Sequence, residues 1–167
     1  MMFSKSKTEK ITHLKQELTS RVKDIKAADL LKNIALADYF FRKFKQEDSD
    51  IVFQELEQIP KGERIPLPTV KGGAIMTTNK TEDNQRNTLS FETIWTVGAT
   101  LVMHRHSDCE EEIIVNKGSA LAIIINGNEE PEKFTLKEGD KLRFGANIKH
   151  QVTALESCDM KVNFYKV

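Results

Sequence analysis

Two histidines and a glutamate stand close together in the second half of the chain. His104 and His106 are separated by one residue in Thr-Leu-Val-Met-His-Arg-His, and Glu111 follows five residues later. Because side chains on a strand alternate between its two faces, both imidazoles are predicted to point to the same side. Glu111 opens the next strand-like run, so a short hairpin is expected to bring three donors together. Fe²⁺, Mn²⁺, Ni²⁺ and Zn²⁺ all accept such nitrogen and oxygen ligands.

A fourth donor must come from elsewhere in the chain. His150 begins the run His-Gln-Val-Thr-Ala-Leu and is the only other histidine in this region. A single histidine in a strand is usually a surface or hydrogen-bonded residue, whereas a pair with a nearby carboxylate favours a metal ion. Spacing alone leaves both interpretations open.

Residues around these four were considered for other roles. Strand alternation predicts that Glu110 and Glu112 point away from the donor side, although a register shift of one residue would make Glu110 the ligand. Cys109 lies in the turn, where a thiol is more often incidental than redox-sensitive. Strand parity gives three candidate polar residues for a pocket, which are Thr100, Asn163 and Tyr165. The aromatic residues Phe91 and Trp95 are expected to fill the core.

The elements that would position these residues are short strands. Runs rich in β-branched and aromatic residues fill the chain from residue 74 to its end, with breaks at glycines and at Asn126-Gly127. Asn126-Gly127 predicts a hairpin with a type I′ turn. Nine strands are expected, approximately at 74–78, 89–97, 100–106, 111–115, 120–125, 133–136, 141–144, 151–154 and 161–166. Strands of this length and spacing indicate a sandwich or barrel.

The N-terminal third has a different pattern. No Gly or Pro occurs from Thr8 to Glu47, and apolar residues recur at helical intervals, which predicts one long amphipathic helix or a helical hairpin. Residues 51–59 fit either a short helix or a strand, and the proline- and glycine-rich stretch from Pro60 to Gly73 is interpreted as a linker. The predicted division is a helical segment with the start of the linker at residues 1–60 and a β-barrel at 61–167.

Two segments resemble the paired motifs of the cupin superfamily. Gly98 to Gly118 fills every fixed position of G-x5-H-x-H-x4-E-x6-G. Gly139 to Ala154 matches G-x5-P-x-G-x2-H-x3-N at Gly139 and His150, with Gly145, Asn147 and Ala154 at the other fixed positions. Asn147 tolerates the left-handed conformation that glycine often supplies, so the turn before His150 is expected to survive.

The resemblance implies a fold, a site and a cofactor. The fold is a mainly β, single cupin (jelly-roll) barrel with an added N-terminal α-helical segment. The implied ligands of one divalent metal ion, Fe, Mn, Ni or Zn, are His104, His106, Glu111 and His150. Four protein donors leave room for water or substrate on an octahedral ion.

The family does not choose a reaction. A metal-dependent enzyme acting on a small molecule, such as an oxygenase or isomerase, is favoured slightly over a non-catalytic sensor or dimerisation module that signals through the helical segment. Lys+Arg and Asp+Glu both number 25, so no basic field favours nucleic acid, and no segment is apolar enough to span a membrane. With only two cysteines, both expected as thiols, a cytoplasmic protein is predicted, acting as a homodimer on a small-molecule ligand.

Overall fold

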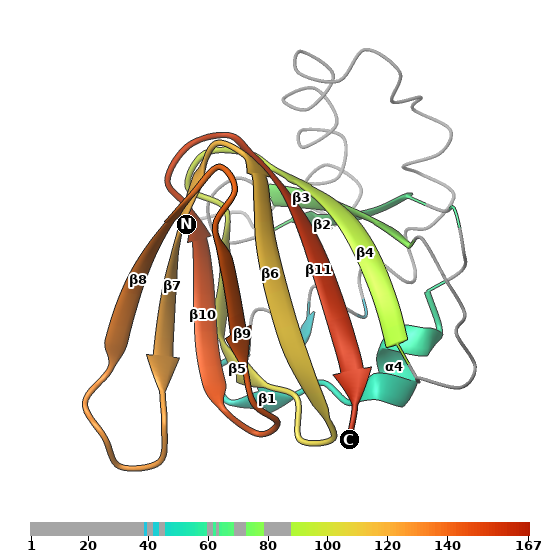
Figure 1. Ribbon diagram of the computed structural model, residues 1–167. Helices are drawn as coiled ribbons and strands as arrows, with labels where there is room; N and C mark the ends of the chain where they lie inside the picture. Colours follow the sequence, from blue (N-terminus) through green and yellow to red (C-terminus); the bar gives the residue numbers. More distant parts are fainter. Residues whose placement is uncertain are drawn as a thin grey trace, which may run out of the picture.

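Two β-sheets pack face to face in the computed structural model and form a barrel-like sandwich (Figure 1). The structure describes residues 39, 42–43, 46–59, 62, 64–68, 73–78 and 88–167. In chain order, the described elements are β1 (Ser49–Asp50), α4 (Phe53–Glu57), β2 (Arg64–Pro68), β3 (Gly73–Thr78), β4 (Thr88–Trp95), β5 (Thr100–Arg105), β6 (Cys109–Lys117), β7 (Ser119–Ile125), β8 (Glu132–Lys137), β9 (Lys141–Phe144), β10 (Lys149–Ala154) and β11 (Cys158–Lys166). This confirms the predicted mainly β fold.

The strands fall into sheets of five and six. One has the order β1-β5-β10-β7-β8 and the other β2-β3-β4-β11-β6-β9. All hydrogen-bonded neighbours are antiparallel except β1 and β5, which are parallel. Consecutive strands such as β5 and β6 lie in different sheets, so the chain crosses repeatedly between the layers.

Period-two burial explains why these residues form strands that pack in layers. Along β6, every second side chain from Cys109 to Val115 is buried, and the residues between them are partly exposed. The side chains that point inward from both sheets fill one interior. Ile51, Phe53 and Leu56, which lie in α4 or just before it, pack into one end of this interior. The segment 49–59, placed by sequence before the barrel, therefore packs with it, and the predicted division at residue 60 stays a prediction.

The interpretation of residues 60–73 as a linker was wrong. Arg64–Pro68 forms β2, which pairs with β3 from Arg64 opposite Thr77 to Pro68 opposite Gly73. Proline cannot donate to a neighbouring strand, which made a strand seem excluded here. In the described part of the chain, β2 lies at the edge of its sheet. Pro66 and Pro68 are two residues apart, so their backbone nitrogens face the same side of the strand. An edge strand can turn that side away from its neighbour and keep its hydrogen bonds to β3.

The β7–β8 hairpin is confirmed, but its turn type was wrong. Six residues separate Ile125 from Glu132, and only Gly127 among them has a positive φ, of 63°. A two-residue type I′ turn needs positive φ at both central residues. Asn147 does adopt the left-handed conformation expected of it, with φ of 67°.

The predicted helical segment at 8–47 lies almost entirely outside the described residues. Within it, Tyr39, Arg42 and Lys43 are helical. No helix in the described part of the chain is long and apolar enough to cross a membrane.

Candidate metal centre

The structure brings the four predicted donors together. One ligand atom from each of His104, His106, Glu111 and His150 lies within 4.8 Å of all the others, and all four side chains are buried. Donors that each stand about 2.0–2.2 Å from one ion have roughly this spread. No other group of three or more His, Cys, Asp or Glu side chains of the described residues forms such a cluster.

A bulge between β5 and β10 aims the first two donors. His150 pairs with His104, but Val152 pairs with Leu101, so β5 carries one more residue than its partner between these pairs. A bulge shifts side-chain parity, which places both Leu101 and His104 inside although they are three residues apart. Beyond the bulge, normal alternation places His106 beside His104.

The donors come from two facing sheets and not from one hairpin. β5 pairs with β1 and β10, whereas Glu111 lies on β6, which pairs with β11 and β9. The turn at Ser107 and Asp108 is therefore a corner between the layers. The predicted hairpin pairing was wrong, but the turn still brings Glu111 to the histidines because the sheets face each other there.

Backbone carbonyls fix all three imidazoles. The Nδ1 atoms of His104, His106 and His150 lie 2.6, 2.6 and 3.0 Å from the carbonyl oxygens of residues 102, 51 and 148. A carbonyl only accepts, so each Nδ1 carries a proton and donates it. In a neutral imidazole the other nitrogen, Nε2, then presents a lone pair.

These lone pairs face a carboxylate. Glu111 Oε2 lies 3.2 Å from Nε2 of His106 and 2.7 Å from Nε2 of His150, and none of the three atoms has a hydrogen-bond partner. Acceptor atoms at this distance repel unless a cation or a proton lies between them. The arrangement therefore fits a bound divalent cation.

The buried surroundings keep these groups ready for a cation. Burial lowers the pKa of His104 well below its ordinary value, and the neighbouring His150 and His106 lower it further, so His104 is neutral. Burial acts to raise the pKa of Glu111, but the His150 and His106 imidazoles outweigh it and the pKa lies well below the usual range. Glu111 is therefore a carboxylate.

The segment from Asp48 to Ile59, here called the strap, holds one ligand in place. Its Ile51 carbonyl accepts from His106 Nδ1. The strap is fixed to the β5–β6 corner by two reciprocal bonds, in which Asp50 Oδ1 accepts from the Ser107 N–H and Asp108 Oδ1 accepts from the Phe53 N–H, both at 2.9 Å. Sequence reasoning missed this contact, because a carbonyl 55 residues from its histidine leaves no pattern.

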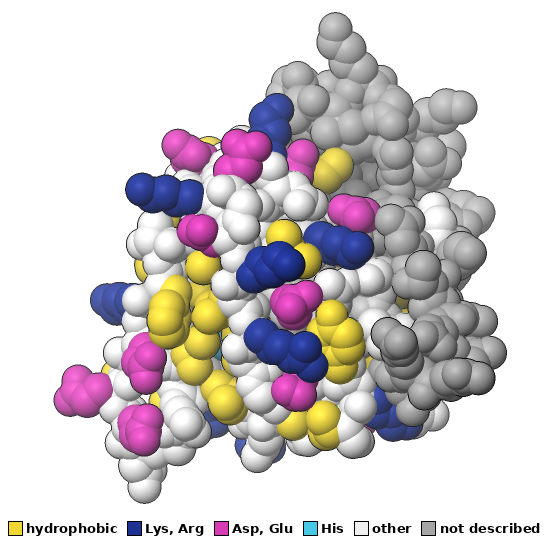
Figure 2. All heavy atoms as spheres, in the orientation of Figure 1, with side chains coloured by type: hydrophobic (Ala, Val, Ile, Leu, Met, Phe, Trp, Pro, Cys, Tyr) yellow, Lys and Arg dark blue, Asp and Glu magenta, His cyan; other side chains and the backbone are white. Residues whose placement is uncertain are grey.

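Residues flanking the cluster have other roles. Glu112 points to the outer face, where it accepts from Asn163 and Tyr165. Arg143 lies over the Tyr165 ring on the same face and pairs with Glu110 at 3.6 Å, so neither acid joins the cluster. In the centre of the face seen in Figure 2, basic and acidic side chains lie next to one another, and acidic side chains gather at its lower left.

Both cysteines are buried, and neither forms a disulfide bond. Burial, the largest cause, raises the pKa of Cys109 far above its ordinary value, and nearby Asp108 adds to this. A raised pKa leaves little thiolate, and Cys109 is a core residue at the start of β6, not in the turn where it was expected.

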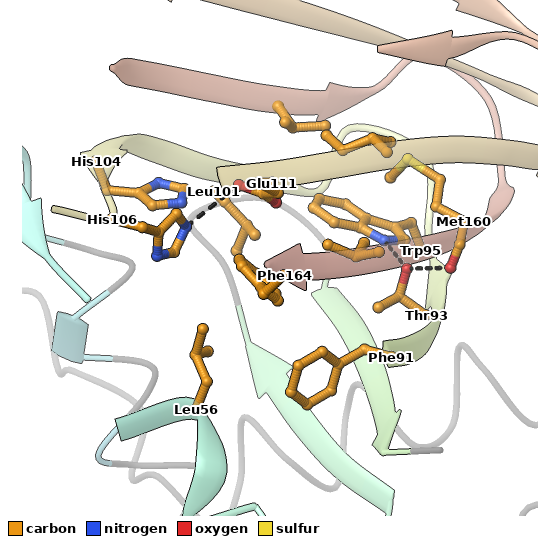
Figure 3. A pocket seen from close by; sticks show the side chains of 13 residues that line it. Leu56, Phe91, Thr93, Trp95, Leu101, His104, His106, Glu111, Met160 and Phe164 are labelled. Carbon is orange, nitrogen blue, oxygen red and sulfur yellow. Dashed lines mark hydrogen bonds and ion pairs between the residues drawn. The ribbon is translucent and has the colours of Figure 1, made fainter. Parts of the chain in front are cut away.

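A cavity of about 40 Å³ adjoins the cluster (Figure 3). His104, His106 and Glu111 line one end of it. The remaining lining residues are Leu56, Phe91, Thr93, Trp95, Leu101, Ile113, Val152, Met160, Val162 and Phe164. Phe91 and Trp95 are buried as predicted, and they also form part of this wall.

The three polar pocket candidates were wrong. Thr100 bonds to Thr153 and the Gly98 carbonyl, because the bulge reverses its parity relative to His104. Asn163 and Tyr165 alternate with the cavity-lining residues of β11 and contact Glu112 on the outer face.

Comparison with solved structures identifies the fold. An oxalate decarboxylase from Bacillus subtilis, a protein with Mn(II) centres, matches with a TM-score of 0.52 and 22% identity over 62% of this chain and 27% of that chain. The chain has the cupin fold. No protein-family profile and no curated protein sequence matches this chain.

Two further solved structures resemble this chain. KdgF from Halomonas sp. matches with a TM-score of 0.49 and 20% identity over 59% of this chain and 84% of that one. An oxalate oxidase matches with a TM-score of 0.45 and 18% identity over 47% of this chain and 42% of that one. The matched region thus spans about a quarter of the decarboxylase and less than half of the oxidase.

Proposed function

We propose that His104, His106, Glu111 and His150 bind one divalent metal ion, and that the adjoining cavity holds a small molecule on which the protein acts. The observation that carries this is the contact of Glu111 Oε2 with two imidazole nitrogens whose protons are on the opposite side of the ring. Such a group of buried acceptors needs a cation, and the donor set suits Fe²⁺, Mn²⁺, Ni²⁺ or Zn²⁺.

The protein's own residues would position the reaction. The three carbonyls orient the imidazoles, and the imidazole Nε2 atoms and the carboxylate supply the donors. A bound ion would polarise an oxygen-bearing substrate and, if redox-active, would support oxygen chemistry. Oxalate appears in the names of two similar proteins, but identities near 20% support the fold and not the substrate.

Metal analysis of protein purified without added metal tests this proposal. One divalent ion per chain is expected in the wild type and in His13→Ala, the control at the only remaining histidine. His104→Ala and His106→Ala should lose most of it. Equal metal content in all four proteins would overturn the assignment.

Turnover distinguishes the type of enzyme. An oxygenase in its Fe²⁺ form should consume oxygen with a suitable small molecule, and its Zn²⁺ form should not, because zinc has no redox chemistry. An isomerase or hydrolase would work with several ions and without oxygen.

A sensor remains the second candidate, because the strap that fixes His106 continues from the N-terminal segment. Tight ligand binding without product under Fe²⁺, Mn²⁺, Ni²⁺ or Zn²⁺ would favour it. The homodimer and the cytoplasmic location remain predictions.

A further inference from the structure

The cavity beside the metal cluster has two chemically different ends. In Figure 3, His104, His106 and Glu111 lie at one end, and Thr93, Trp95 and Met160 lie at the other. Leu56 and Phe91 approach from the side of α4 and β4. A ligand in this space would have one part at the cluster and the rest among hydrocarbon and aromatic side chains.

The far end has little capacity for polar recognition. Its one hydroxyl, on Thr93, donates to the Met160 carbonyl and accepts from Trp95 Nε1, both at 2.8 Å. Among the described residues that line the cavity there is no Lys or Arg. A charged or hydrogen-bonding group placed there would lose its water without gaining a partner.

The size of the space limits the apolar part of a ligand. About 40 Å³ is open to the centres of water-sized molecules. That is the room taken by roughly three waters, which a chain of about two to four carbons would fill.

We propose that the ligand is a small molecule with metal-binding oxygens at one end and a short uncharged apolar tail at the other. The oxygens lie at the cluster and the tail extends between Phe91, Trp95 and Ile113. This rests on the proposed function, since the oxygens need a metal ion to bind. A compact dicarboxylate has no part suited to the apolar end.

A homologous series tests the tail. Mn²⁺-loaded protein is titrated calorimetrically with glycolate, lactate, 2-hydroxybutanoate, 2-hydroxypentanoate and 2-hydroxyoctanoate, which chelate through the same atoms. Affinity should rise about fourfold per carbon, the factor for ~0.8 kcal/mol per buried methylene, and should fall again at the longest tail. 2-Hydroxyglutarate has a carboxylate where 2-hydroxypentanoate has its methyl group, and it should bind at least about tenfold more weakly.

Adjacent isoleucines on β6 provide matched variants. Ile113 is 2% exposed and lines the cavity, whereas Ile114 alternates to the other face. Ile113→Phe should remove the gain from longer tails while keeping metal content and glycolate affinity, and Ile114→Phe should behave like the wild type. Val162→Ile is a milder filling variant that should shorten the preferred tail by about one carbon, which keeps the test valid if Ile113→Phe does not fold.

The outcomes separate the two proposals. Protein that takes up no Mn²⁺ and binds no hydroxy acid contradicts the proposed function and this inference together. Protein that binds Mn²⁺ and glycolate but shows equal affinity along the series, or prefers 2-hydroxyglutarate, contradicts the apolar-tail inference alone.

Discussion

His104 and His150 are direct cross-strand partners on β5 and β10, with ring centroids 4.3 Å apart. Each Nδ1 atom donates to a carbonyl oxygen two residues earlier in the chain, at Val102 and Ile148, so both Nε2 atoms turn towards the interior. Two imidazoles this close resist being protonated together. Burying the pair is therefore expected to lower the unfolding free energy of metal-free protein, and a cation bound by both imidazoles would offset this loss.

Glu111→Gln should weaken the metal site and also destabilise the metal-free fold. The amide keeps the shape of the side chain but removes its negative charge, so metal affinity should fall by at least about tenfold to a hundredfold. The lowered pKa of Glu111 means that the folded metal-free chain stabilises the carboxylate, so removing its charge should also lower the unfolding free energy of metal-free protein, by about 1 kcal/mol or more. Chelator competition and urea unfolding with EDTA measure the two effects.

Glu112→Gln is the matched control for this change. It lies one residue away on the outer face and should leave metal affinity unchanged. Unchanged metal affinity in Glu111→Gln would contradict the assignment of Glu111 as a ligand.

Metal-free protein should lose stability on acidification. His104 has a lowered pKa when folded, so as the pH falls through about 6.5 the unfolded chain takes up a proton that the folded chain does not. Stability therefore decreases below that pH, by about 1 kcal/mol per pH unit from His104 alone. Glu111, also with a lowered pKa, adds to the loss below about pH 4.5 because only the unfolded chain is then protonated.

Urea unfolding in EDTA between pH 7.5 and 5.5 measures this slope. In His104→Asn, the unfolding free energy should depend less steeply on pH, by the amount that corresponds to about one proton. His13→Ala tests the remaining histidine outside the cluster. Identical slopes for wild type and His104→Asn would show that His104 is not buried as a neutral imidazole.

The strap should support the metal site through His106. Asp108→Ala removes the acceptor for the Phe53 N–H, so the strap and its Ile51 carbonyl should loosen. We expect a loss of about 1–2 kcal/mol in unfolding free energy and about a tenfold loss of metal affinity. Asp108→Asn keeps an acceptor oxygen and should restore most of both.

Asp140→Ala is the control for loss of a similar bond far from the site. Asp140 Oδ2 accepts from the Lys137 N–H at 2.8 Å in the β8–β9 turn. The Asp140→Ala variant should have a lower unfolding free energy but unchanged metal affinity. An equal loss of metal affinity in Asp140→Ala and Asp108→Ala would mean that the strap has no specific role.

Gly118, which closes the first motif, should tolerate no side chain. Its φ is 82°, and an added Cβ would lie 2.3 Å from the Ser157 carbonyl oxygen. Gly139 has a φ of 91° but nothing within 4 Å of the same position. Gly118→Ala should therefore lower the unfolding free energy by more than about 2 kcal/mol and Gly139→Ala by only about 1 kcal/mol, as measured by urea unfolding.

The sequence was sufficient for the donors because their spacing is local. His104, His106 and Glu111 lie within eight residues, and the motif brought in His150 from a distant strand. Pairing partners were not predictable in the same way, because the corner at Ser107 looks like a hairpin turn in sequence. The face of the strand on which the Thr100 side chain lies was also predicted wrongly, because a bulge is not visible in the pattern of residue types.

Contacts between distant segments were beyond sequence reasoning. The Ile51 carbonyl that fixes His106 is a backbone atom and carries no residue signature. Two prolines hid β2, because a strand interior excludes proline whereas an edge strand accepts it. The cavity wall likewise depends on side chains from both sheets and from α4.

X-ray absorption spectroscopy of the Zn²⁺-loaded protein tests the central claim most directly. The account predicts nitrogen and oxygen neighbours at about 2.0–2.2 Å with scattering from three imidazoles, and two imidazoles in His150→Ala. A sulfur neighbour at about 2.3 Å, or a spectrum without imidazole scattering, would contradict a site built from His104, His106, Glu111 and His150.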